Sequence, residues 1–560
     1  MLLEKAKSPA FWQGVRMDPA YRSIISHIKA RFEENYQEEY PALRYRDRRR
    51  FYLDGDRSRF EKPYFHRRIV LSAAAILALL YPEEEKYLTA LEDVMWAIMD
   101  EYSWALPAHT DGTLKGDLST VDLFNAETGM ALAEITFFLG DRFDGPVRER
   151  VHKEIRRRVI ETYREGHFGW ETTDNNWAAV CAGAVGCTLM YEDPAEFSRQ
   201  LPRLLETMKC FLSGFPEDGT CLEGFSYWLY GFGYFVWFAD LYKRFTDGKA
   251  DLLGDPKVER IAGYIPRSIL RGVTTVSYSD GTATGIADLG LQHYLHARFP
   301  QSVPLPPEEN LSVWGGNIGW LIYLRAFLYF DPAEKSVPLT EKDIFLPDAG
   351  QYLARREKYS AAIKAGHNDE PHNHNDIGSF IIATDEGQVF VDLGGGLYTR
   401  QYFEPATRYT ILCNSSFGHS VPYIGGVGQK EGRAYKGSIT RNADGVTVEM
   451  ADAYEKGVVS ALSRRIIAGE EQMILEDTFD CGEKTLTERF VTLVKPEIYE
   501  DHVRVQGVTL TFDPAGAKLT LREEKHLTHT PAFGADGVPV WCLDFEVLPG
   551  KNRFRAAFTF

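Results

Sequence analysis

Three histidines lie close together in residues 366–378, which read Gly-His-Asn-Asp-Glu-Pro-His-Asn-His-Asn-Asp-Ile-Gly. They are His367, His372 and His374, out of 14 histidines in the chain. Imidazole side chains exchange protons near neutral pH and bind transition metals. In an extended chain, residues two apart project to the same face, so we expect His372 and His374 to point together.

A β-hairpin is expected directly after this segment. Residues 379–384 and 389–393 are rich in β-branched and aromatic residues, and an Asp-Glu-Gly-Gln turn separates them. Asp392 falls on the second strand, and His419 follows within a Gly-His-Ser sequence. His374, Asp392 and His419 offer two nitrogens and one oxygen, which suits Zn²⁺ with an open fourth position. A polar loop whose histidines hydrogen-bond to neighbours is the alternative interpretation.

The first half of the chain contains three more segments with residues that could form a site. They read Trp-Ala-Leu-Pro-Ala-His at 104–109, Asn-Asn-Trp-Ala-Ala-Val at 175–180, and Glu-Gly-Phe-Ser-Tyr-Trp-Leu-Tyr-Gly at 223–231. Either Asn175 or Asn176 can cap the helix predicted from Trp177. The other amide is then available as an uncharged hydrogen-bond donor in a site.

The last of these segments begins a row of polar and hydroxyl-bearing residues. Glu223, Tyr227, Tyr230 and Tyr234 would share one face of a helix if the segment were helical throughout. Tyrosine is an unfavourable choice for a dry core unless its hydroxyl finds a partner. We therefore interpret the row as part of a site, with an aromatic core stripe as the alternative.

Long helices must position these three segments. From Phe11 to about Tyr329, apolar residues recur three and four apart, and short turns separate the stretches. The expected helices cover residues 69–80, 87–102, 123–139, 147–163, 176–191, 196–211, 227–245, 258–270 and 315–328. Paired helices in succession predict a helical toroid.

The pattern changes near residues 331–338, and short segments with period-two alternation follow. They cover residues 446–450, 473–477, 486–492, 503–505, 508–512 and 553–559. Such strands with turns between them predict an antiparallel β-sandwich. We therefore expect two domains, an N-terminal (α/α) toroid over residues 1–335 and a C-terminal β-sandwich over residues 336–560.

Composition limits the classes of function. The chain has 560 residues and a formal net charge of −17, which argues against general nucleic-acid binding but allows an acidic substrate in a local basic cleft. The seven cysteines are scattered without a CxxC pair, which favours free thiols in a reducing compartment. No signal-peptide pattern is visible, and the apolar run at 69–81 is short for a membrane span. We expect a cytoplasmic protein with no membrane partner.

Together, the segments at 104–109, 175–180 and 223–231, followed by His372, His374, Asp392 and His419, resemble the heparinase II/III-like polysaccharide lyases. The resemblance covers most of the chain. It implies an α/α toroid followed by a β-sandwich, and an acidic oligosaccharide or polysaccharide as substrate. It also implies β-elimination at a uronic acid, in which the proton at C5 is removed and the sugar at O4 leaves.

The resemblance also implies roles for single residues. Tyr227 matches the catalytic tyrosine, with Tyr230 as second choice, and His372 matches a histidine that serves as base or holds the substrate carboxylate. Asn176 matches the amide that neutralises this carboxylate, although many relatives carry histidine where this chain has Trp177.

The resemblance further implies that His374, Asp392 and His419 hold a metal, most simply zinc, which supports the site. The residues expected to bind substrate are Trp104, His109, Trp177, Glu223, Arg400 and Arg408.

Two other functions compete with the lyase. A glycoside hydrolase would need two carboxylates about 5–9.5 Å apart, for which Glu223 with Asp218 or Asp174 with Glu171 are the candidate pairs. A carbohydrate-binding protein that has lost catalysis is the other alternative. The sequence leaves open whether the uronic acid is glycosaminoglycan-like or alginate-like, whether cutting is endolytic or exolytic, and whether the chain forms a homo-oligomer.

Overall fold

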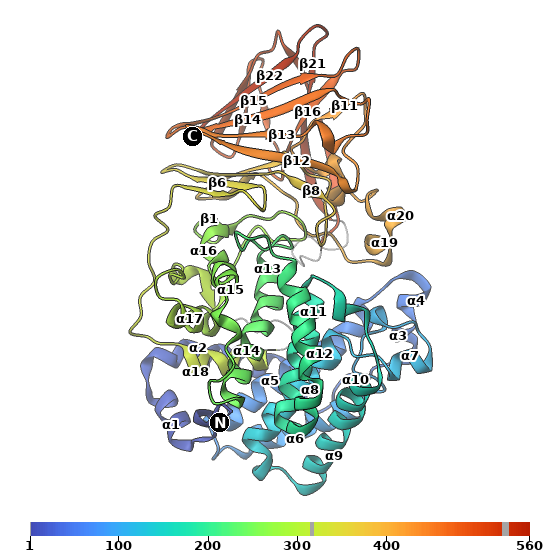
Figure 1. The fold of residues 1–560 in the computed structure, drawn as a ribbon, viewed down its shortest axis with the longest axis vertical. Helices are drawn as coiled ribbons and strands as arrows, with labels where there is room; N and C mark the ends of the chain where they lie inside the picture. The colour runs from blue at the N-terminus through green and yellow to red at the C-terminus, as the bar shows by residue number, and fades with distance from the viewer. Residues whose placement is uncertain (1, 314–318, 529–536) are drawn as a thin grey trace.

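The computed structural model describes residues 2–313, 319–528 and 537–560, and it has two parts (Figure 1). Helices form most of the first part up to α18, which ends at Tyr329. Antiparallel sheets form most of the second part, which begins with β5 at Asp343. The predicted fold class, a helical toroid followed by an antiparallel β-sandwich, is confirmed.

The toroid is built from helices that pack against their neighbours in sequence, such as α5 with α6, α11 with α12 and α17 with α18. The longer helices are α5 (Ser58–Leu80), α6 (Glu85–Met99), α8 (Leu123–Leu139), α9 (Gly145–Ile155), α11 (Asn176–Glu192), α12 (Pro194–Ser213), α14 (Gly233–Phe245), α17 (Leu289–Arg298) and α18 (Trp320–Tyr329). Of the helix predicted over 315–328, residues 315–318 lie outside the described residues, and α18 begins at Trp320.

A buried carboxylate on α8 joins the end of the toroid to its middle. Glu134 accepts hydrogen bonds from both terminal nitrogens of Arg325 on α18, at 2.5 and 2.6 Å. The indole of Trp320 and the hydroxyl of Tyr191 donate to the same carboxylate, at 2.9 and 3.0 Å. A buried charge is stable only when it is paired and hydrogen-bonded, so these contacts hold α18 against α8.

Helix α5 has 23 residues, so it is longer than the apolar run at 69–81. By length and hydropathy it is the one helix among the described residues that could cross a membrane, but 78% of its most apolar window is buried in this structure. Its C-terminal half is a central helix of the toroid core.

The described residues of the second part form three antiparallel sheets. The largest has the strand order β17-β18-β19-β22-β15-β14-β13-β12-β8, a second has the order β11-β16-β21-β20, and a third has the order β10-β9-β7-β6-β5. The main strands of the first two are β12 (Gly432–Asn442), β13 (Gly445–Glu449), β14 (Ala461–Ala468), β15 (Gln472–Asp480), β16 (Leu486–Thr492), β19 (Val508–Phe512), β20 (Ala517–His526), β21 (Val538–Val547) and β22 (Arg553–Thr559). The third includes β6 (Gln351–Arg355), β7 (Ser360–Lys364), β9 (Phe380–Thr384) and β10 (Gly387–Phe390).

The predicted hairpin after the histidine segment is present, since β9 and β10 pair antiparallel with Thr384 opposite Gly387. Asp392 lies two residues beyond the end of β10, where the chain has left the ladder. It is therefore held by a loop, and its place relative to the histidines depends on tertiary contacts.

Arg464 on β14 fixes the loops that carry the histidines. Its side chain is fully buried and pairs with Asp477 at 2.7 Å and Glu488 at 2.6 Å. Its Nη1 atom also donates to the backbone carbonyls of Gly378 and Ser420, both at 2.7 Å. Gly378 ends the histidine segment and Ser420 follows His419, so one guanidinium ties both to the sandwich.

We expect the substitution Arg464→Met to lower the free energy of unfolding by about 3–5 kcal/mol, because it leaves Asp477 and Glu488 buried without a cation. The neighbouring Arg465 provides a matched control on the same strand, since its pair with Asp444 is half exposed. Arg465→Met should cost about 0–1 kcal/mol. Chemical denaturation followed by circular dichroism measures both, and equal losses would contradict the role given to Arg464.

Candidate active site

The candidate site lies where the two parts of the chain meet. A loop between β2 (Thr274–Thr275) and β3 (Ala287–Asp288) brings Asp280 from the toroid, and the segment between β8 (Gly366–Asn368) and β9 brings the histidines. Two residues there adopt left-handed backbone conformations, Ser279 with φ of 58° and His372 with φ of 57°. Such conformations cost about 1–3 kcal/mol each in residues other than glycine, and they cluster at functional sites.

Asp280 is the centre of the site, and the sequence analysis did not single it out. Its Oδ2 atom accepts hydrogen bonds from His372 Nδ1 at 2.6 Å and from the Tyr398 hydroxyl at 2.7 Å. Its Oδ1 atom accepts from His374 Nε2 at 3.0 Å and from the Tyr402 hydroxyl. One carboxylate of the toroid thus takes four donors from the C-terminal part.

The charge of Asp280 is stabilised by these donors. Burial alone would raise the pKa of its carboxyl, but the hydrogen bonds and charges of His372 and His374 hold the pKa well below its usual range. A signal for Asp280 is present in the sequence, because it is the one charged residue between Arg271 and Asp288 and stands in a Ser-Asp-Gly turn. A lone charge in such a stretch indicates a specific partner.

Tyr227 stacks on His372, with ring centroids 4.4 Å apart and an angle of 23° between the planes. Its hydroxyl lies 2.6 Å from that of Tyr398, which itself donates to Asp280. Burial and the negative charge of Asp280 raise the pKa of Tyr227, so the phenol is protonated at neutral pH. Tyr227 and His372 therefore share one site and one carboxylate.

A π-helical turn over Trp228–Phe232 follows Tyr227 and contains Tyr230. The extra residue rotates the following positions relative to a regular α-helix, and such turns are frequent at functional sites. Tyr230 and Tyr234 consequently line a separate cavity with Glu127, and Glu223 precedes the helix start at Phe225. The segment is therefore not a regular α-helix throughout, which was the condition on which Glu223, Tyr227, Tyr230 and Tyr234 were expected to share one helix face.

Glu223 and Asn176 border the site on the toroid side. Asn175 caps α11 by accepting a hydrogen bond from the Trp177 amide, and the Asn176 amide donates to Glu223 Oε1 at 3.1 Å. Glu223 Oε2 is buried, has no hydrogen-bond partner among the described residues and lies 3.7 Å from His372 Nε2. Burial raises the pKa of Glu223 to about 7. The Asn176 side chain is only 2% exposed, and its oxygen is also unpartnered among the described residues.

His374, Asp392 and His419 form a buried cluster whose candidate ligand atoms all lie within 4.8 Å of one another. His419 Nε2 donates to the Cys413 carbonyl at 2.6 Å, which leaves its Nδ1 facing Asp392 Oδ2 at 2.9 Å. His374 gives Nε2 to Asp280, and its Nδ1 has no hydrogen-bond partner among the described residues. A nitrogen lone pair left unpaired in a buried cluster fits a cation, and the carboxylate behind His374 is the usual support for a metal-binding imidazole.

His526, at the end of β20, lies close to this cluster and was also missed by the sequence analysis. Its ring is buried, and burial together with the neighbouring His374 lowers its pKa to about 4. The ring is therefore neutral at neutral pH. Its distance in sequence from the other histidines explains why spacing did not reveal it.

The residues predicted to bind substrate are placed differently from one another. Trp104 is fully buried and its indole donates to the Ile98 carbonyl at 2.9 Å, so it belongs to the core and the prediction that it lines the cleft is wrong. His109 bonds to Asp122 at 2.7 Å and contacts Trp177 edge-on at 4.7 Å. His109 and Trp177 line a cavity of about 410 Å³ that also includes Asn175.

The two arginines also differ. Arg408 donates to the backbone carbonyls of Tyr402 and Asn373, both at 3.0 Å, so its guanidinium holds the site loops together. Arg400 forms an exposed ion pair with Glu404 at 2.7 Å. Neither side chain touches Tyr227 or His372 through a hydrogen bond or ion pair found among the described residues.

The fold, a helical toroid followed by a β-sandwich, is shared with solved structures of several polysaccharide lyases. Heparan sulfate lyase HepC from Pedobacter heparinus has a similar structure, with a TM-score of 0.58, 13% identity, and coverage of 99% of this chain and 86% of that chain. The chondroitin AC lyase of Streptomyces coelicolor A3 in complex with chondroitin sulphate has a TM-score of 0.54 and 10% identity, with coverage of 98% of this chain and 82% of that chain. A Paenibacillus xanthan lyase has a TM-score of 0.53 and 10% identity, with coverage of 99% of this chain and 59% of that chain. At such low identities the likeness establishes the fold.

The C-terminal part can be assigned more closely. Residues 338–556 match the family described as heparinase II/III-like, C-terminal, and this part of the chain is a domain of that family. No curated protein matches the chain in sequence.

We expect Asp280→Asn to weaken the contact between the two domains. An asparagine has one acceptor oxygen, so at least one of the four donors from His372, His374, Tyr398 and Tyr402 loses its bond. Each unsatisfied buried group costs about 1–3 kcal/mol. Calorimetry should show a lower melting temperature, whereas Asp385→Asn, which affects an exposed pair with Arg271, should leave it nearly unchanged. Equal melting temperatures for both variants would rule out a central role for Asp280.

Proposed function

We propose that the chain is a lyase that cleaves uronic-acid-containing glycans by β-elimination and leaves an unsaturated uronate at the new end. The observation that carries the proposal is the stacking of Tyr227 on His372, both linked to the buried carboxylate of Asp280 at the domain interface. An acid and a base on neighbouring rings suit a reaction that removes a proton at C5 and protonates the leaving oxygen at O4. The similar structures of lyases acting on acidic glycans support this reading.

The hydrogen bonds suggest which residue plays which part. His372 donates its Nδ1 proton to Asp280, so in its neutral form the ring carries a lone pair on Nε2 that can accept the C5 proton. Asp280 holds the ring in this tautomer and stabilises the imidazolium that forms. Tyr227, whose pKa is raised, keeps its proton until it donates to O4. Asn176, whose backbone N–H donates to Glu223 at the edge of the site, offers a side-chain amide that we assign to the substrate carboxylate.

The glycoside hydrolase alternative has less support. Asp218 accepts hydrogen bonds from the backbone amides of Asp348 and Ala349, at 3.0 and 2.9 Å, so its carboxylate connects the two domains. Glu171 is paired with Arg203 at 2.6 Å. Both carboxylates are thus committed to structural contacts, which leaves Glu223 and Asp174 without the partners that a hydrolase needs.

We also propose that the cluster of His374, Asp392 and His419 binds zinc, which matches its two nitrogens and one oxygen. When bound, zinc would supply a positive charge that orients His374 and, through it, Asp280. Since His372 shares Asp280 with His374, the position of the base depends on the metal ligand. The role proposed for the metal is therefore support of the site.

The zinc proposal predicts about one zinc per chain in the purified protein, measured by elemental analysis after mild dialysis. His374→Ala should lose the zinc and lower the melting temperature, because metal binding contributes to folding. His167→Ala is the control, since 88% of this histidine's side chain is exposed and it lies in the toroid, outside the cluster. A protein without metal whose melting temperature is unchanged by a chelator would disprove the proposal.

The lyase proposal predicts that a panel of uronic-acid oligosaccharides yields products absorbing near the ultraviolet band of a C4–C5 double bond, which a hydrolase does not form. Tyr227→Phe should keep the fold and lower kcat about 10²–10⁴-fold, because it removes the proton donor. Tyr499→Phe is the control, because this tyrosine is exposed and its hydroxyl donates to Glu497 away from the site. It should retain kcat within about threefold, a change of under 1 kcal/mol. Normal turnover by Tyr227→Phe would refute the assignment.

A further inference from the structure

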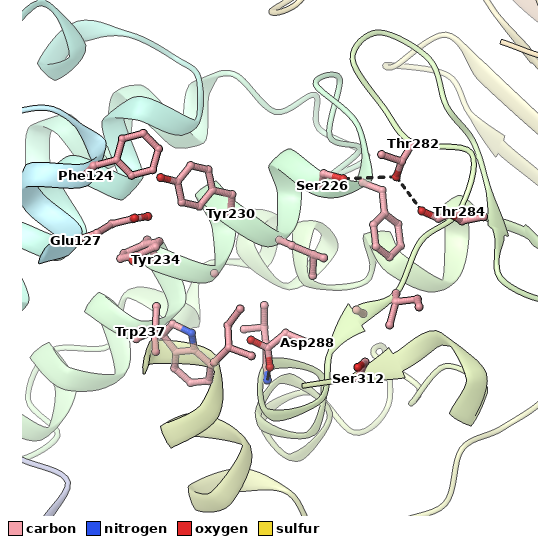
Figure 2. A pocket seen from close by; sticks show the side chains of 18 residues that line it. Phe124, Glu127, Ser226, Tyr230, Tyr234, Trp237, Thr282, Thr284, Asp288 and Ser312 are labelled. Atoms are coloured by element: carbon pink, nitrogen blue, oxygen red, sulfur yellow. Dashed lines mark hydrogen bonds between the residues drawn. The ribbon is translucent and has the colours of Figure 1, made fainter. Parts of the chain in front are cut away.

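A cavity of about 580 Å³ lies in the toroid next to the candidate active site (Figure 2). Helices α8, α14, α17 and α18 line it, together with residues 282–288. It shares a wall with the site, because Ser226 directly precedes Tyr227 and Thr282 lies two residues after Asp280. The hydroxyls of Ser226 and Thr282 are 3.5 Å apart at this wall. A glycan held at Tyr227 therefore has the cavity beside it.

The lining combines aromatic rings with hydroxyl groups. Phe124, Tyr230, Tyr234 and Trp237 gather at one end, as Figure 2 shows, and Ser226, Thr282, Thr284 and Ser312 lie at the other. Aromatic faces pack against the apolar C–H faces of a sugar ring, and hydroxyls bond to its edges. None of the described residues that line the cavity is a lysine, arginine or histidine.

Two carboxyl groups are part of the lining, and neither attracts an anion. Glu127 is almost completely buried between Tyr230 and Tyr234, and burial raises its pKa to about 8. Asp288 caps α17 by accepting from the Leu291 amide at 3.1 Å, and burial raises its pKa to about 7. A carboxyl in its neutral form donates and accepts hydrogen bonds, as a hydroxyl does, and in its ionised form it repels an anion. A sulfate or carboxylate here would be buried without a cation, which is costly.

From this lining we infer that the cavity is the subsite for the sugar next to the uronic acid, and that it takes an uncharged pyranose, either a hexose or an N-acetylhexosamine. The inference rests on the proposed lyase function and deepens it. It means that the substrate alternates a uronic acid with a neutral sugar. Polyuronates and glycans sulfated on the neighbouring sugar are disfavoured, since their charge would enter a cavity without a cationic partner.

Paired substrates test the inference. One oligosaccharide has glucuronic acid next to N-acetylglucosamine, and the other is identical except for a sulfate on that neighbouring sugar. We expect kcat/KM to be at least about tenfold higher for the uncharged substrate, a difference of about 1.4 kcal/mol. Equal or faster turnover of the sulfated substrate, or of a pure polyuronate, would overturn the inference while leaving the lyase function in place.

A substitution at Gly233 tests the place of the subsite. Gly233 opens α14 and lines the cavity, and an added Cβ would meet just one neighbour within 4 Å, Leu291 at 3.6 Å. Gly233→Leu should therefore fold and fill part of the cavity, raising KM for the uncharged substrate about tenfold or more with a smaller effect on kcat. Gly233→Ala is the control, with a change in KM of less than about threefold. An unchanged KM in Gly233→Leu would overturn the inference.

Binding measured without turnover separates the two proposals. Titration calorimetry with the uncharged oligosaccharide on Tyr227→Phe, with and without Gly233→Leu, reports on the cavity alone. We expect the added leucine to weaken binding at least about tenfold, and equal binding would overturn the inference. A wild-type chain that forms no unsaturated product from any uronate would instead refute the lyase function, whatever the calorimetry shows.

Discussion

One buried carboxylate holds the candidate site together. Asp280 comes from the toroid, and all four of its hydrogen-bond donors, His372, His374, Tyr398 and Tyr402, come from the C-terminal part. Two of these donors have further roles. His372 is the proposed base, and His374 belongs to the candidate metal cluster. The positions of the proposed base and of the metal cluster, and part of the contact between the domains, therefore all depend on Asp280.

Much of the fold was predictable from local patterns. The spacing of apolar residues predicted the bounds of α8 and α11 to within one residue. The alternation of apolar and polar residues predicted the strands β16, β19 and β22. The cluster of His374, Asp392 and His419 was also predicted and is present, although the reasoning was partly wrong. His372 has a left-handed backbone, so strand alternation is not what brings the two histidines together. They meet because both reach Asp280, from its two different oxygens.

What could not be predicted depends on tertiary contacts. The spacing of apolar residues gives no sign of the π-helical turn after Tyr227. This turn contains Tyr230, which lines a different cavity. Trp104 was expected to line the cleft, but its indole is buried and donates to the Ile98 carbonyl. Arg408 looks like a substrate ligand, but two backbone carbonyls occupy its guanidinium. In each case the partner is distant in sequence or is a backbone group, which residue types alone do not reveal.

Asp280 and its four donors lie in different domains, which affects whether one domain of such a chain can be exchanged for that of another protein. A C-terminal domain transferred to a foreign toroid would keep its two histidines and two tyrosines, but their protons would face a surface without an acceptor. A graft of this kind needs an acidic side chain at the matching turn before its imidazoles take up the required tautomers. Compatibility between the halves thus depends strongly on one position in a short loop, so chimeras built on this architecture should be screened there first.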